Sequence, residues 1–203
     1  MLVIGLAGGI ASGKSLVASC FEHFGAIVLD ADRVGHEVLK EPAVIAAIVA
    51  QWGPGLLKDG EIDRIALARI VFDPKSEDSS QLERLEQITH PRIGQRIREQ
   101  LAQLESEAIA VVLDAPVMFK AGWDRLCDKI VFVEADPSIR EQRAGQRGWP
   151  HEELARRENR QTPIAEKRSK STDVIDNSKS KEATFVQVRD LWRSWNLSLP
   201  QSN

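Results

Sequence analysis

The 203-residue sequence contains few cysteines and no long apolar run. Cys20 and Cys127 are too few and too far apart for a CxxC metal site or a disulfide framework, so we expect both to be buried small side chains in a reducing compartment. No apolar stretch of the sequence approaches the roughly 20 residues that a membrane-spanning helix needs. We therefore expect a cytoplasmic protein without a membrane partner.

The beginning of the sequence lacks the basic residues that open a signal peptide. Its apolar start, MLVIGLAGGI, runs directly into a glycine-rich turn and Lys14. We interpret this segment as a first β-strand rather than as a targeting sequence.

An excess of positive charge is also missing, because the net charge is -3. This balance argues against a nucleic-acid partner. The charge is unevenly distributed, however, since residues 140–170 carry nine Lys or Arg against five Asp or Glu. A local basic segment of this kind favours the binding of a phosphorylated small molecule.

Five short apolar runs have the length of β-strands and are separated by longer segments with helical spacing. They are residues 2–6, 26–29, 109–113, 130–133 and 174–175. Near-continuous apolar runs are expected where helices cover both faces of a parallel sheet. The pattern predicts a doubly wound α/β fold, in a chain long enough to bury a core without disulfides or metals.

The stretch from residue 33 to residue 107 contains no convincing strand and predicts a helical insertion. Pro91 suits the first turn of its last helix, with Thr89 or His90 as the cap. Taken alone, His90 is better explained by such a structural role than by catalysis. A further apolar stripe at helical spacing predicts a packed C-terminal helix: Phe185, Val188, Leu191, Trp192 and Trp195.

The strongest motif is Gly8-x4-Gly13-Lys14-Ser15, which fits the full pattern of a phosphate-binding loop. Backbone amides of such a loop and the following helix N-terminus surround the phosphates of a nucleotide. Lys14 is expected to reach the β- and γ-phosphates, and the Ser15 hydroxyl to bind Mg²⁺. The motif follows a predicted strand and opens an apolar-periodic helix, which is the context it requires.

Acidic side chains end several of the predicted strands, among them Asp30, Asp32 and Asp114. In open α/β sheets ligands bind beyond the carboxyl ends of the strands, so a carboxylate there can hold Mg²⁺ through water or accept a proton. These acids could instead cap the following helices. For Asp32, spacing alone leaves the general base and the helix cap as equal alternatives.

The basic segment contains Arg140, Arg143 and Arg147 at intervals that place them along one side of a helix. After a break predicted at Pro150, the segment continues with Arg157, Arg160 and Lys167. Arginines on a mobile segment can neutralise a transferring phosphoryl group and exclude water, as a closing lid does. An ordinary solvated helix face is the alternative, and it is favoured for Arg156 and Arg168.

Taken together, these motifs resemble the dephospho-CoA kinase family over nearly the whole chain. The segments that carry the resemblance are GGIASGKS, IVLDAD, DGEIDRIALARIVF, ITHPRI, VVLDAPVMF, the arginine-rich segment and DVIDN. That family phosphorylates the ribose 3′-hydroxyl of dephospho-CoA with MgATP, in the last step of coenzyme A synthesis. Its fold is similar to that of nucleoside monophosphate kinases.

The resemblance implies a P-loop NTPase three-layer fold with a five-stranded parallel sheet. The nucleotide-binding core would comprise residues 1–31, 108–138 and 172–203. Residues 32–107 would form the helical acceptor (CoA)-binding insertion, and residues 139–171 a helical lid. The substrates would be ATP and dephospho-CoA, and the protein a monomer or weak homo-oligomer.

The resemblance also implies roles for individual residues. Asp32 corresponds to the catalytic base, acting with Lys14 and Arg143, while Arg64 and His90 correspond to the acceptor-binding region together with Asp32. The ATP-binding positions would be Gly8, Gly9, Ala11, Ser12, Gly13, Lys14, Ser15, Leu16, Arg143, Arg147 and Asn177, the last in a segment that resembles the adenine-binding turn.

Three positions depart from the family pattern. Leu16 replaces the usual threonine after GKS, Lys120 stands where glutamate is common, and Thr172 stands where alanine is usual. None removes a named catalytic group, although Lys120 reverses the charge at a position near the expected acceptor site.

Two other functions fit parts of the sequence. The loop and the basic segment alone suit a kinase for a nucleoside monophosphate or another small alcohol. A GTP-dependent switch is disfavoured, because the sequence has no NKxD segment and the strand ending at Asp114 continues as Ala-Pro instead of a DxxG turn.

Overall fold

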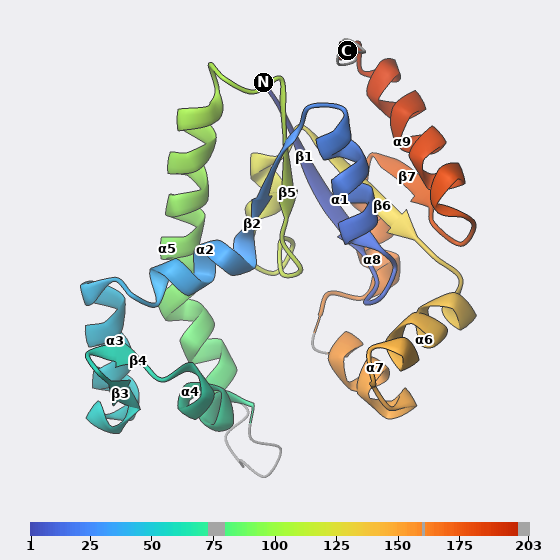
Figure 1. Cartoon of the computed structure of the whole chain (residues 1–203). Coiled ribbons are helices and arrows are strands. Elements are labelled where there is room, and N and C mark those ends of the chain that lie inside the picture. Colours follow the sequence, from blue (N-terminus) through green and yellow to red (C-terminus); the bar gives the residue numbers. More distant parts are fainter. Residues whose placement is uncertain (73–79, 160, 199–203) are drawn as a thin grey trace. The chain divides into compact units, whose positions relative to one another are not determined.

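A computed structural model describes residues 1–72, 80–159 and 161–198, and the chain divides into two compact units (Figure 1). The first unit comprises Met1–Asp30 and Leu101–Asn203, and the second Ala31–Gln100. The first unit contains the phosphate-binding motif.

The first unit is built on a parallel sheet, in which the described residues form five strands in the order β2-β5-β1-β6-β7. The strands are β1 (Leu2–Gly8), β2 (Ile27–Asp30), β5 (Ala110–Asp114), β6 (Lys129–Glu134) and β7 (Asp173–Asp176). The predicted five-stranded parallel sheet is confirmed. Because β1 is central, the loop that follows it opens at the middle of the sheet's carboxyl edge, which is where nucleotides bind in such folds.

Helices pack against this sheet. The first unit contains α1 (Lys14–His23), α6 (Pro137–Gln146), α7 (His151–Glu158), α8 (Ile164–Ser169) and α9 (Lys181–Ser194). The break predicted near Pro150 lies between α6 and α7. Helix α9 begins where the Ser180 hydroxyl accepts a hydrogen bond from the Ala183 amide at 3.2 Å, a normal N-terminal cap.

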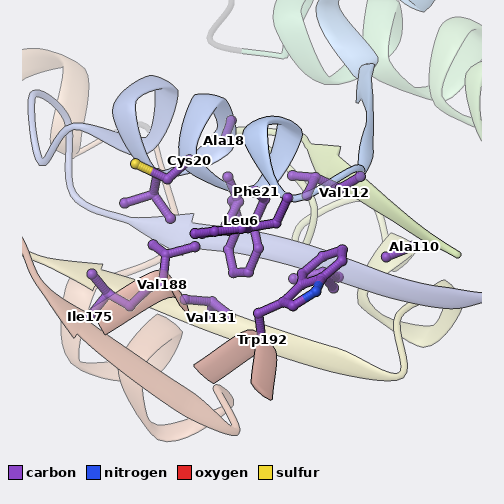
Figure 2. Close-up of a cluster of buried hydrophobic side chains, with 14 of the residues drawn as sticks. Leu6, Ala18, Cys20, Phe21, Ala110, Val112, Val131, Ile175, Val188 and Trp192 are labelled. Carbon is purple, nitrogen blue, oxygen red and sulfur yellow. The ribbon is translucent and has the colours of Figure 1, made fainter. Parts of the chain in front are cut away.

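Side chains of α1 and α9 form a common core with one face of the sheet (Figure 2). Phe21 of α1 and Trp192 of α9 are fully buried, and their ring centroids lie 6.2 Å apart. Cys20 is buried in the same cluster, as expected, whereas Cys127 is only half-buried, contrary to the expectation. The stripe predicted for the C-terminal helix is therefore confirmed, and truncating either ring to Ala would cost about 3–5 kcal/mol. This core fixes α1, and with it the phosphate-binding loop, to the sheet.

The second unit is mainly helical. It contains α2 (Ala31–Val38), α3 (Pro42–Trp52), α4 (Arg64–Val71) and most of α5 (Gln81–Leu104), with a short η1 turn (Pro54–Leu56). The Glu41 carboxylate, directly before α3, accepts a hydrogen bond from Arg96 Nε at 2.7 Å and also pairs with Arg92. These bonds tie the start of α3 to α5.

One element of the second unit was not predicted from the sequence. A short antiparallel hairpin joins β3 (Leu57–Lys58) to β4 (Glu61–Ile62). Its turn residues, Asp59 and Gly60, have φ angles of 54° and 84°. An Asp-Gly pair is typical of a type I′ hairpin turn, so the signal was present but the strands are too short to show alternation.

The predicted role of Pro91 is wrong. Pro91 lies inside α5, so Thr89 and His90 are interior helical residues and neither is an N-cap. An internal proline loses one backbone hydrogen bond and costs about 3 kcal/mol. Burial on the same helix offsets this cost, because Ile93 and Ile97 are at most 8% exposed. Tertiary packing thus overrides the local preference of proline.

No helix in the described ranges is both long enough and apolar enough to cross a membrane.

Candidate nucleotide-binding site

The phosphate loop (residues 8–15) connects β1 to α1, and its backbone requires glycine. Gly13 stands at the N-cap of α1 with φ 95° and ψ 30°, in the left-handed region. A methyl group on Gly13 would overlap the side-chain amide of Asn177, and one on Gly8 would lie 2.6 Å from the Val133 carbonyl oxygen. The loop therefore passes too close to its neighbours for any larger residue at these two positions.

Lys14 lies in the first turn of α1 and is directed back along the loop. Its Nζ donates to the Gly9 carbonyl oxygen at 3.2 Å. Burial lowers the pKa of Lys14, and the carboxylate of Asp114 opposes that shift. Asp114 ends β5, whose register pairs it with Leu6 of β1. A cation thus stands at the carboxyl edge of the sheet beside an acid of the neighbouring strand.

Three of the predicted ATP-site residues meet at one point of the loop. The Ser12 carbonyl oxygen accepts hydrogen bonds from Asn177 Nδ2 at 2.7 Å and from Arg143 Nη1 at 3.1 Å. Arg143 Nη2 also donates to the Asn177 carbonyl oxygen at 2.9 Å. Sequence reasoning missed Thr184, whose hydroxyl donates to Asn177 Oδ1 at 2.8 Å and fixes the orientation of that amide.

Glu158 is a second residue that the sequence did not single out. Its carboxylate accepts a hydrogen bond from the backbone amide of Ile10 at 3.2 Å and pairs with Arg140. A methyl group on Gly9 would lie 2.6 Å from Arg140 Nη1. The carboxylate of α7 and the guanidinium of α6 therefore both touch the start of the phosphate loop.

Lys167 belongs to the predicted basic segment, but no individual role was predicted for it. It lies on α8, is 4% exposed, and its Nζ donates to the Gly8 carbonyl oxygen at 3.4 Å and to Gln161 Oε1 at 2.6 Å. A small hollow beside the loop is lined by residues of β1, α1, α8 and the segment after β5: Leu6, Ala7, Gly8, Lys14, Ala115, Pro116, Met118, Phe119 and Lys167.

Two further arginines of the basic segment lie near the ring of Trp149. The Arg147 guanidinium follows α6 and lies 5.8 Å from the centroid of the Trp149 ring, and Arg157 lies 4.4 Å from it. Trp149 packs against a buried cluster that includes Ala11, so the segment is held to the loop by apolar contact. Arg156 and Arg168 are exposed. Arg160, which contributes to the basic charge count, lies outside the described residues.

Within the second unit, Asp32 and Arg64 stand in the first turns of their helices. Helix α2 begins at Ala31, so Asp32 is the exposed second residue of this helix and not its N-cap. The alternative that Asp32 is the N-cap of the helix is therefore wrong. Arg64 Nη2 lies 2.6 Å from His36 Nε2, a partner that sequence reasoning missed. His90 is half-buried on α5.

The three departures from the family pattern have different surroundings. Leu16 packs against the core under α1, whereas Lys120 is exposed. The Thr172 hydroxyl accepts a hydrogen bond from the Ile130 amide at 3.0 Å, and the Thr172 amide donates to the Ile130 carbonyl oxygen at 2.9 Å. Thr172 therefore adds a hydrogen bond between β6 and the start of β7.

A glycine-rich loop with Lys14 after the central parallel strand, flanked by arginine-bearing helices, defines a P-loop kinase. The family model described as dephospho-CoA kinase matches residues 2–182. The chain belongs to the dephospho-CoA kinase family.

Individual relatives agree with this assignment. A dephospho-CoA kinase of Geobacter metallireducens is 44% identical over 197 residues, covering 95% of this chain and 96% of the relative. One from Symbiobacterium thermophilum is 39% identical over 198 residues, covering 96% of this chain and 81% of the relative.

Solved structures are similar as well. Protein TT1252 of Thermus thermophilus has a TM-score of 0.77 and 32% identity, with coverage of 95% of this chain and 97% of that one. Dephospho-CoA kinase from Campylobacter jejuni has a TM-score of 0.71 and 28% identity, with coverage of 96% and 98%.

Proposed function

We propose that this chain transfers the γ-phosphate of ATP to the ribose 3′-hydroxyl of dephospho-CoA, giving coenzyme A and ADP. The observation that carries the proposal is the family match over residues 2–182, in which the phosphate loop is intact. The reaction is the last step of coenzyme A biosynthesis. We further propose that the protein works in the cytoplasm as a monomer or weak homo-oligomer, without nucleic-acid or membrane partners.

The donor side of the reaction is assigned to the phosphate loop. The amides around Gly9, Ala11 and Gly13, with the N-terminus of α1, would surround the phosphates of ATP. Lys14 would bind the β- and γ-phosphates, and Leu16 would belong to the same phosphate-binding turn of α1. Arg143 and Arg147, in the lid of residues 139–171, would neutralise charge that develops on the transferring group.

Mg²⁺ is expected to accompany ATP. The Ser15 hydroxyl is exposed in the first turn of α1, and the Asp114 carboxylate ends the neighbouring strand β5. Both are oxygen donors of the kind that Mg²⁺ prefers, so these residues fit the ion. When bound, the ion neutralises charge on the phosphates.

We propose that Asn177 supports ATP binding indirectly, by fixing the conformation of the phosphate loop. Its side-chain amide is 1% exposed and is engaged by Ser12 and Thr184. Fixing the Ser12 carbonyl oxygen sets the direction of the amide that follows it. Asn177 would therefore position the loop for ATP.

The acceptor side is assigned to the insertion of residues 32–107. Asp32 is proposed to accept the proton of the attacking 3′-hydroxyl, as one aspartate commonly does in kinases. Its carboxylate is exposed in the first turn of α2, which suits this role. Arg64 and His90 would bind the acceptor, with His36 orienting Arg64.

An acceptor panel tests the proposal. ADP release is measured with dephospho-CoA, CMP, AMP, adenosine and shikimate, with Lys14→Met as the control for contaminating kinases. We expect acceptor-dependent turnover with dephospho-CoA alone, and almost none from the control. Turnover with CMP but not with dephospho-CoA would instead support a nucleoside monophosphate kinase.

A further inference from the structure

Lys167 is a buried lysine that lies outside the phosphate-loop motif. Helix α8 packs against β1, and this places Lys167 next to the start of the loop, where the side chain is 4% exposed. Lysine is almost never fully buried unless it is paired. The Lys167 ammonium group therefore needs a partner that offsets the free-energy cost of its lost hydration.

The partners that the described residues supply are incomplete. Lys167 Nζ donates to the Gly8 carbonyl oxygen and to Gln161 Oε1, both of which are neutral acceptors. An ammonium group has three donors, so one remains for a further acceptor. The nearby acid Glu158 already receives hydrogen bonds from the Ile10 amide and from Arg140. The described surroundings thus leave a buried positive charge without an ion pair of its own.

Lys14 and Lys167 line the same hollow from α1 and α8. Two cations beside one hollow repel each other, and an anion bound between them would remove this repulsion. The hollow also meets the backbone of Gly8 and the residues that follow β5, Ala115 and Pro116. Because Lys14 belongs to the phosphate-binding motif, the anion expected there is a phosphate of the nucleotide.

We propose that Lys167 is a second cationic ligand of the terminal phosphate of ATP, contacting from α8 the group that Lys14 contacts from α1. This inference rests on the proposed function and extends it to a residue outside the loop. Charge on both sides of the γ-phosphate would balance the negative charge of its equatorial oxygens during transfer.

The ionisation of Lys167 agrees with this arrangement. Burial and the nearby charge of Lys14, partly opposed by Glu158, together lower the pKa of Lys167 to about 8. A bound phosphate stabilises the charged ammonium and raises its pKa. Above about pH 8, ATP must therefore bind together with a proton, which weakens its affinity.

Calorimetric titration with ATP, ADP and dephospho-CoA tests the inference. Lys167→Met removes the charge, and Lys167→Gln removes it while keeping a donor for Gly8. Arg168→Met is the matched control, since it removes one charge from the exposed side of the same helix. We expect both Lys167 variants to bind ATP at least about tenfold more weakly, with ADP and dephospho-CoA affinities within about threefold of the parent.

A pH series separates ligand binding from a purely structural role. The affinity of the parent for ATP should fall above about pH 8 more steeply than that of Lys167→Met. Equal ATP affinity in the parent and both variants would overturn the inference, as would a loss confined to dephospho-CoA or parallel pH profiles. Failure of the proposed function is a different result, because the parent would then show no turnover with dephospho-CoA even if its ATP affinity depended on Lys167.

Discussion

Asn177 Nδ2 donates a 2.7 Å hydrogen bond to the carbonyl oxygen of Ser12, across 165 residues of sequence. The bond joins the segment after β7 to the phosphate loop after β1. The Thr184 hydroxyl of α9 donates a hydrogen bond to Oδ1 of the same side-chain amide. The conformation of the loop is therefore set partly by the C-terminal part of the fold.

Replacing Asn177 with Ala should loosen the loop. The change leaves the Thr184 hydroxyl with only its longer contact to the Ser180 carbonyl oxygen at 3.3 Å, and it removes one of two donors from Ser12. We therefore expect a loss of about 1–3 kcal/mol in the free energy of unfolding. The affinity for ATP should fall as well. Denaturant unfolding and ATP titration measure both effects. Thr184→Val, which removes only the orienting hydroxyl, should give a smaller loss of each, and an Asn177→Ala protein with normal ATP affinity would contradict a positioning role.

Gly13 and Gly60 form a matched pair for the phosphate loop. Both have positive φ, 95° and 84°, but a methyl group on Gly60 meets nothing within 4 Å, whereas one on Gly13 overlaps Asn177. Gly60→Ala should cost about 1–2 kcal/mol of stability through backbone strain and leave ATP affinity intact. Gly13→Ala should lose ATP binding in addition. Similar ATP affinities in the two variants would show that the clash does not matter.

Asp32→Asn tests the proposed general base. The amide keeps the shape of the side chain but cannot take a proton, so kcat should fall by about 10²–10⁴-fold. The Kd for ATP should stay the same. Glu37→Gln, on the exposed side of the same helix, is the control and should keep activity within about twofold. Near-normal turnover of Asp32→Asn would remove Asp32 from the mechanism.

Lys167 should make stability depend on pH. Its pKa is about 8 in the folded protein and about 10.4 in an unfolded chain. Between these values the unfolded state binds more protons, so the stability of the parent rises with pH. The parent should therefore gain stability relative to Lys167→Met as the pH rises from about 8 to about 10. Unfolding curves measured across this range should show that gain, while the difference between the parent and Arg168→Met stays flat.

The sequence predicted the sheet well because the inner strands β1, β5 and β6 are buried on both faces. Near-continuous apolar runs then mark each strand, as at β1 and β6, and a local motif marks the phosphate loop. Pro91 was misplaced because burial along α5 outweighs the local cost of proline. The β3–β4 hairpin was missed because two-residue strands carry no periodic signal.

The supporting residues of the candidate site could not be predicted from local patterns. Glu158 contacts an amide 148 residues away, and Lys167 contacts a carbonyl oxygen 159 residues away. Before the fold is known, both belong to a helical segment of mixed charge that a solvated surface explains equally well. Only the packing of α7 and α8 beside the loop distinguishes these two side chains from their exposed neighbours, such as Arg168.

The most direct test of the central claim is the identity of the product. The purified protein is incubated with ATP, Mg²⁺ and dephospho-CoA, and the product is examined by ³¹P NMR and by chromatography against coenzyme A. We expect a new phosphomonoester signal coupled to the ribose 3′-proton, a product that elutes with coenzyme A, and one ADP formed for each. A phosphate on another hydroxyl, or ADP formed at the same rate without dephospho-CoA, would contradict the claim.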